Sequence, residues 1–137
     1  MNVCVLLLLL VAHQALAHQN VTLSDIRKLW RRTMSPVQSE CMCKTGVTQR
    51  VLDKFFKYGN MPDDPCFGCF MNCVNLKLGI MNSAGEIDAK ILSEVVDYVD
   101  ISLAQKCVNK TGEPDRCRKA FLLFQCVYDD LSKQFPA

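Results

Sequence analysis

Residues 66–73 read Cys-Phe-Gly-Cys-Phe-Met-Asn-Cys, and this stretch decides the fold. Asp64-Pro65, directly before it, is a strong helix start signal and Gly79 is a good stop, so a helix is predicted over 66–78. Cys69 and Cys73 are four residues apart and therefore lie on one face of that helix. They are poorly placed to bond each other, so we expect this face to be joined to two neighbouring helices.

A second constraint comes from the cysteines near the C-terminus. A helix is expected from about residue 114 to 131, and it carries Cys117 and Cys126, nine positions apart. At about 100° per residue, nine positions place the two side chains on opposite sides of the helix. Each must reach a different helix, so the pattern favours bridges that interlock helices over local hairpins.

The first residues predict export of the chain. Residues 1–17 include 14 apolar residues and no charged side chain. The apolar core 3–12 is too short to span a bilayer, and Ala15-Leu16-Ala17 fits a cleavage site. We therefore expect a secretory signal peptide over 1–17 and a mature domain over 18–137 in extracellular fluid. The eight cysteines beyond this leader then indicate up to four disulfides rather than a metal site.

Other residue types exclude most enzyme classes. His18 is the single histidine beyond the leader, so Ser-His and Cys-His hydrolases lose their proton acceptor. The chain lacks H-E-x-x-H, G-x-S-x-G, P-loop and G-x-G-x-x-G motifs. Its net charge of +2 is too small to argue for nucleic acid. We expect no enzyme, no cofactor, no metal and no nucleic-acid partner.

The rest of the chain also predicts helices. Apolar spacing and start signals place them at about 22–34, 36–43, 48–56 and 88–105, with a turn at 81–85. With the two cysteine-bearing helices this gives an all-α, compact bundle of about six helices. There is no internal repeat and no linker, so one domain is expected.

The order of the cysteines carries a resemblance. Cys41, Cys69-x3-Cys73, Cys107 and Cys117-x8-Cys126 are similar to the six-cysteine signature of the insect odorant-binding proteins, the pheromone-binding and general odorant-binding family. The resemblance also covers Cys41-x4-Gly46-Val47 and Gly85-x-Ile87-Asp88. It implies the pairs Cys41–Cys73, Cys69–Cys117 and Cys107–Cys126, in a helical domain that encloses an apolar pocket.

Three features depart from the family pattern. Cys43 and Cys66 are additional, the run from Cys73 to Cys107 is short, and the chain is mildly basic. We predict a fourth bridge, Cys43–Cys66, because these are the two thiols left unassigned. Cys66-x-x-Cys69 at a helix start could instead be a redox dithiol, but no alternation of strands and helices surrounds it.

The resemblance implies a carrier that takes a small apolar volatile or a lipid-like ligand, such as an odorant or pheromone, toward chemosensory receptors. Flexible Met side chains would let the wall of its pocket adapt. The candidate wall residues are apolar positions expected to face inward: Trp30, Met34, Phe56, Met71, Val74, Met81, Ile91, Val95, Leu103, Leu123 and Val127. Candidates for one orienting polar contact are Asn75, Tyr98 and Tyr128. Phe135 is a candidate lid, released by protonation of Asp129, Asp130 or the terminal carboxylate.

Other interpretations stay open. Arg27, Lys28, Arg31 and Arg32 form either a solvated face or a dock for an anionic membrane or a receptor. A carrier outside olfaction, a helical secreted signalling protein and a saposin-like membrane-active protein are alternatives, and the chain could be a monomer or a homodimer. Asn20 and Asn109 lie in N-glycosylation sequons.

Overall fold

The computed structural model describes residues 2–9 and 20–137, and the predicted cleavage site at 15–17 lies outside the described residues. The helices are α2 (Leu23–Thr45), α3 (Gln49–Phe56), α4 (Pro65–Lys77), α5 (Ala89–Val95), α6 (Ile101–Asn109) and α7 (Arg116–Gln134). Residues 3–9 are also helical. In the described part of the chain, β-structure is limited to a single bridge between Met81 and Ile87. The all-α prediction is confirmed.

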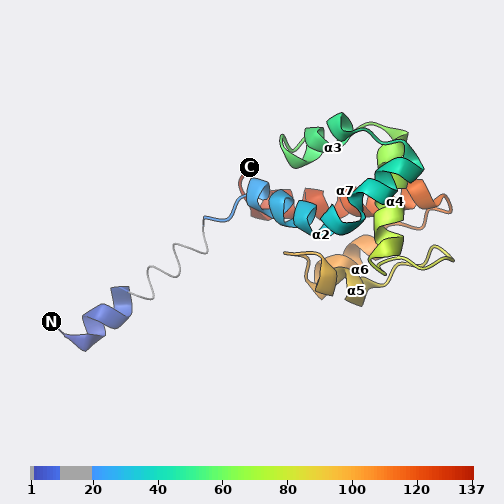
Figure 1. Cartoon of the computed structure of the whole chain (residues 1–137). Coiled ribbons are helices and arrows are strands. Elements are labelled where there is room, and N and C mark those ends of the chain that lie inside the picture. The colour runs from blue at the N-terminus through green and yellow to red at the C-terminus, as the bar shows by residue number, and fades with distance from the viewer. Residues whose placement is uncertain (1, 10–19) are drawn as a thin grey trace.

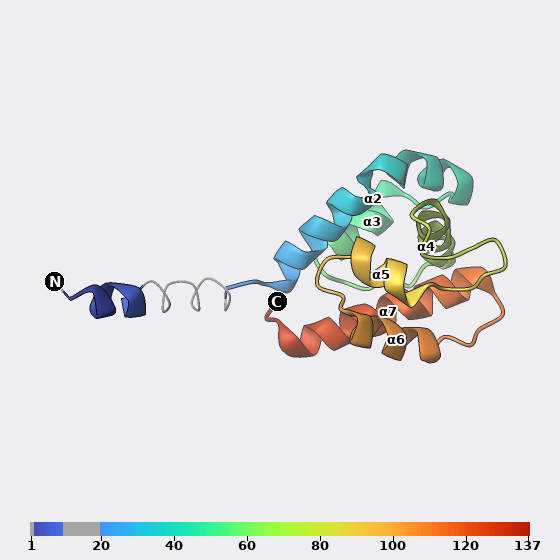
Figure 2. The ribbon, with the colours of Figure 1, turned by 90° about the horizontal axis from the view of Figure 1, so that it is seen from below.

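The helices pack around α7 (Figure 1). α4 crosses α7 and makes the most extensive helix–helix contact, while α2 packs on α4 and α6 on α7. α3 lies on one side of α7, and α5 and α6 lie on the opposite side, as Figures 1 and 2 show. None of the described helices is long and apolar enough to cross a membrane.

Side-chain caps set where the helices begin. At the N-terminus of each helix from α2 to α7, the side chain of the residue before the helix accepts a hydrogen bond from a backbone N–H of the first turn, and each such cap stabilises a helix by about 1 kcal/mol. The capping residues are Thr22, Thr48, Asp64, Asp88, Asp100 and Asp115. The start signal at Asp64-Pro65 is therefore confirmed, as are the helix starts expected at about residues 22, 48 and 88.

Two predicted boundaries are wrong. The helices expected at 22–34 and 36–43 are one helix, α2, with Pro36 inside it. Pro36 is exposed, so water can solvate the backbone carbonyl that a proline leaves without an N–H partner. The helix expected over 88–105 is instead two, because the Asp97 carbonyl accepts the Trp30 Nε1–H at 2.9 Å and Asp100 caps a new start. Tyr98 between them has a left-handed φ of 66°.

Three disulfides tie four helices together. Cys41–Cys73 joins α2 to α4, Cys69–Cys117 joins α4 to α7, and Cys107–Cys126 joins α6 to α7. These are the pairs that the resemblance implies. In the chain-entropy view of disulfides each contributes about 3–4 kcal/mol for loops of this length.

The predicted fourth bridge is wrong, because Cys43 and Cys66 are both free thiols. Cys41 reaches Cys73 near the C-terminal end of α4, whereas Cys66 lies in the first turn of α4. Seven residues of helix separate Cys66 from Cys73 by about 10 Å along the axis. Cys43 is exposed on α2, two residues from Cys41, and therefore lies near the C-terminal end of α4, away from Cys66.

Thiol counting tests this arrangement. Alkylation of the denatured, unreduced protein is expected to label Cys43 and Cys66 and to leave six cysteines of the 20–137 segment unlabelled until reduction. Peptide mass mapping of the labelled sites is the measurement. Recovery of a Cys43–Cys66 cross-linked peptide would contradict the structure.

The crossing of α4 and α7 depends on a glycine. A Cβ added at Gly68 would lie 2.6 Å from the Cys117 carbonyl oxygen, which is backbone and is tied to α4 by the adjacent disulfide. Only a residue without a Cβ lets the two helices approach this closely.

Gly68→Ala is therefore expected to lower the free energy of unfolding by about 1–3 kcal/mol, the usual cost of overpacking. Gly112→Ala is the matched control, because a Cβ there meets nothing within 4 Å. Chemical denaturation of both variants is the measurement. Equal stabilities would show that the α4–α7 contact does not need glycine.

Candidate ligand-binding pocket

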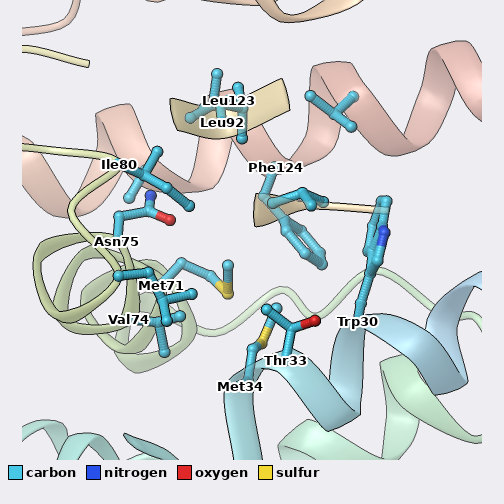
Figure 3. Close-up of a pocket in the computed structure, with 14 residues that line it drawn as sticks. Trp30, Thr33, Met34, Met71, Val74, Asn75, Ile80, Leu92, Leu123 and Phe124 are labelled. Atoms are coloured by element: carbon cyan, nitrogen blue, oxygen red, sulfur yellow. The ribbon is translucent and has the colours of Figure 1, made fainter. Parts of the chain in front are cut away.

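An apolar pocket lies between α2, α4, α5 and α7 (Figure 3). The volume of this cavity is about 40 Å³. Small-molecule sites usually offer several hundred Å³, so this cavity is far smaller. A ligand of ten or more carbon atoms therefore has to displace wall side chains. Met34 and Met71 both point into this space, and unbranched thioether chains repack readily.

Seven of the predicted site residues line this pocket: Trp30, Met34, Met71, Val74, Asn75, Leu123 and Val127. Seven others that line it were not predicted: Thr33, Leu78, Ile80, Leu92, Val96, Ala120 and Phe124. A signal for some of these was present, because residues 120, 123, 124 and 127 have the i, i+3, i+4, i+7 spacing of one helix face.

The remaining eight predicted residues lie outside the pocket lining: Phe56, Met81, Ile91, Val95, Tyr98, Leu103, Tyr128 and Phe135. Leu92 of α5 and Val96 directly after it line the pocket, each one position beyond the predicted Ile91 and Val95.

Two polar side chains line the pocket. Asn75 is 4% exposed, and its amide lies between Ile80 and Met71 (Figure 3). No hydrogen bond joins this amide to another described residue, although the Asn75 backbone carbonyl accepts from the N–H groups of Ile80 and Met81. The Thr33 hydroxyl donates to the Leu29 carbonyl of its own helix. The Asn75 amide thus has both its donors and its acceptor available to a ligand.

Trp30 closes one end of the pocket and connects it to the C-terminus. Its ring packs edge-on against Phe124 at 5.6 Å, and its Nε1–H holds the Asp97 carbonyl. The next residue, Tyr98, packs edge-on against Phe135 at 5.5 Å. Phe135 therefore contacts the segment that carries Val96, and it does not line the cavity itself. Its role as a lid stays a prediction.

A buried cation lies beside the pocket without lining it. Arg27 is 6% exposed, donates from Nη1 to the Tyr128 hydroxyl at 2.8 Å and from Nε to the Phe56 carbonyl at 3.4 Å. Arg27 is thus not part of a solvated basic face, because it lies on the inward side of α2. Tyr128 and Phe56, both predicted as wall residues, serve instead as partners of this guanidinium.

Carboxylates link neighbouring helices at the surface. Hydrogen bonds from Lys77 and Lys44 lower the pKa of Glu40 to about 2, and Lys77 lies on α4 whereas Glu40 lies on α2. The bond from Arg31 lowers the pKa of Asp53, and the bond from Lys106 lowers that of Asp130. Each of these pairs stabilises the fold above the ordinary carboxyl pKa and loses that contribution as the pH falls through the lowered value.

Two further predicted sites remain predictions. Asn20 and Asn109 are both exposed, as glycosylation would require. No group of three or more His, Cys, Asp or Glu residues in the described ranges 2–9 and 20–137 is arranged to hold a metal ion.

Known proteins are similar in sequence to half or more of this chain. The B2 protein of Tenebrio molitor is 29% identical over 130 residues, covering 90% of this chain and 91% of that protein. General odorant-binding protein 57e of Drosophila melanogaster is 35% identical over 72 residues, covering 50% of this chain and 53% of that protein.

Solved structures share the fold. The odorant-binding protein dmelOBP28a from Drosophila melanogaster matches with a TM-score of 0.60 at 19% identity, over 79% of this chain and 97% of its own. The fatty acid binding protein OBP56a from the oral disk of the blowfly Phormia regina matches with a TM-score of 0.53 at 18% identity, over 85% and 98%.

The family assignment rests on a match to a family model. Residues 26–130 match the sequence model of the PBP/GOBP family, and this range contains all six bridged cysteines and every residue that lines the pocket. The pocket and its disulfide frame thus lie within the region that defines the family. The chain is a member of the PBP/GOBP family.

Proposed function

We propose that this protein is a secreted, non-catalytic carrier that binds small uncharged apolar molecules and moves them through extracellular fluid toward chemosensory receptors. Membership of the family and the odorant-binding protein fold support a carrier of small hydrophobic ligands. The observation that carries the proposal is the pocket itself, which lies between α5 and three cross-linked helices and is apolar except for Thr33 and Asn75. Odorants and pheromones are the proposed cargo, and the sensillar lymph of an insect is the proposed setting.

The affinity expected for such a ligand is modest. Burying about 300 Å² of apolar ligand surface gives roughly 7 kcal/mol at about 25 cal/mol per Å². This corresponds to micromolar binding before the costs of immobilising the ligand and repacking the wall are subtracted. Such weak, reversible binding suits uptake and release by a carrier.

The chemistry of the lining selects among ligand classes. A buried carboxylate needs a cation or several hydrogen bonds to offset its lost hydration. The pocket has no cationic side chain in its lining, and Arg27 is occupied by Tyr128 and Phe56. An alcohol, aldehyde, ketone or ester needs only the amide of Asn75. We therefore place neutral oxygenated ligands ahead of fatty acids, the ligand class from which the blowfly protein takes its name.

A pocket-filling variant tests whether this cavity is the binding site. Val127→Phe adds a ring into the lining and is expected to lower the affinity for a fluorescent naphthylamine probe at least tenfold. Leu76→Phe is the matched control, because Leu76 is exposed on α4 and does not line the pocket. Probe titration and its displacement by volatile compounds are the measurements. No probe uptake by the unmodified protein, or unchanged uptake by Val127→Phe, would refute the assignment.

Ligands of matched chain length test the role of the amide. A long-chain alcohol is expected to bind at least tenfold more tightly than the corresponding carboxylate at pH 7. Asn75→Leu should weaken binding of the alcohol about three- to tenfold, the value of one hydrogen bond, and should leave the corresponding alkane unaffected. Competition against the probe measures all three. Tighter binding of the carboxylate would reverse the proposed ligand class.

A further inference from the structure

The charge of the described domain is divided unevenly between its helices. Residues 20–60 contain eight Lys or Arg and three Asp or Glu, a net charge of +5, whereas residues 61–137 contain eight and eleven, a net charge of −3. The overall value of +2 therefore conceals a basic part formed by α2 and α3 and an acidic remainder.

The structure brings the basic residues of these two helices together. Arg31 of α2 donates to Asp53 of α3 at 2.7 Å, and Gln38 of α2 donates to Gln49 of α3 at 3.4 Å. Beside this seam, Lys28 and Arg32 are exposed on α2. Arg50, Lys54 and Lys57 are exposed on and directly after α3. We call these five residues, with Arg31, the basic face.

Most of the charge on the basic face is uncompensated. Asp53 is the single carboxylate at the seam, and it is shared by Arg31 and Lys57. No carboxylate of the described residues lies within 4.0 Å of the charged groups of Lys28, Arg32, Arg50 or Lys54. Four cations on two adjoining helices thus remain available to an external anion.

An aromatic residue adjoins these cations. Tyr58 follows Lys57 and is 72% exposed. Tyrosine is favoured at membrane–water interfaces, where its ring meets the acyl boundary and its hydroxyl meets water. Exposed lysines and arginines beside such a ring are typical of proteins that dock on anionic lipid surfaces.

We infer that the basic face docks the protein on membranes that contain anionic phospholipid. The division of charge sets the orientation, because the lipid headgroups attract α2 and α3 and repel the acidic remainder. α2 then separates the membrane from the pocket, since Trp30, Thr33 and Met34 line the pocket from that helix. The use of this docking for delivery of a ligand rests on the proposed carrier function, whereas the docking itself does not.

Vesicle binding tests the inference. Protein recovered from the medium of secreting insect cells is mixed at low salt with phosphatidylcholine vesicles, with or without 30% phosphatidylserine, and is sedimented. We expect binding to the phosphatidylserine vesicles, little binding to phosphatidylcholine alone, and loss of most binding in 0.5 M NaCl. Equal binding to both vesicles, or none to either, would overturn the inference.

Paired substitutions locate the docking surface. Arg32→Gln with Lys54→Gln removes one cation from each helix of the basic face. The two lost cations together are expected to lower the partition coefficient about 30-fold. Lys90→Gln with Lys110→Gln is the control, since both lysines are exposed outside α2 and α3 and the net charge falls equally. An equal loss in both pairs would show that net charge alone acts and would refute the basic face.

Two more measurements separate this inference from its rivals. Tyr58→Ser is expected to weaken vesicle binding several-fold, and an unchanged partition coefficient would remove the aromatic contact from the inference. Binding to an acidic polypeptide but not to vesicles would overturn the inference of membrane docking and would indicate a protein partner. Every variant is also titrated with the naphthylamine probe, so failure of docking with intact probe binding leaves the carrier function standing.

Discussion

The close crossing of α4 and α7 is the constraint on which the rest of the structure depends. Gly68 allows the two backbones to meet, and Cys69–Cys117 fixes them at that point. α2 is then positioned on α4 by Cys41–Cys73, and α6 on α7 by Cys107–Cys126. Because the helices are fixed at these points, a cavity can persist between them without the side-chain packing that would otherwise have to hold the bundle together.

Much of this frame could be predicted from local chemistry. The spacing of Cys69 and Cys73 requires two partner helices, and Cys117 and Cys126 must face opposite ways, so interlocked bridges follow from helix geometry alone. The capping residues define helix starts because a side-chain acceptor satisfies an exposed N–H within the same turn. Such signals need no knowledge of the rest of the fold.

The errors arise where a distant group decides. The split between α5 and α6 depends on Trp30, which is almost seventy residues away in the sequence. Its Nε1–H donates a hydrogen bond to the Asp97 carbonyl. The sequence also does not decide between Ile91 with Val95 and Leu92 with Val96, since all four are apolar and the choice depends on how α5 packs on the other helices. Arg27 lies in the interior because Tyr128 and Phe56 are there to accept from it, which no spacing within α2 could indicate. Cys43 and Cys66 likewise stay unpaired because Cys41 bonds to Cys73, far along α4 from Cys66.

The three bridges also define which part of the wall is left untied. They connect α2, α4, α7 and α6 in one covalent series, and α5 is joined to it only through the chain at its two ends. Of the four helices around the pocket, α5 alone has no cross-link, and it is seven residues long. Leu92 and Val96 thus contribute to the pocket from a segment that no disulfide holds in place. α5 is therefore the one wall of the pocket that is held by packing and hydrogen bonds without a covalent cross-link.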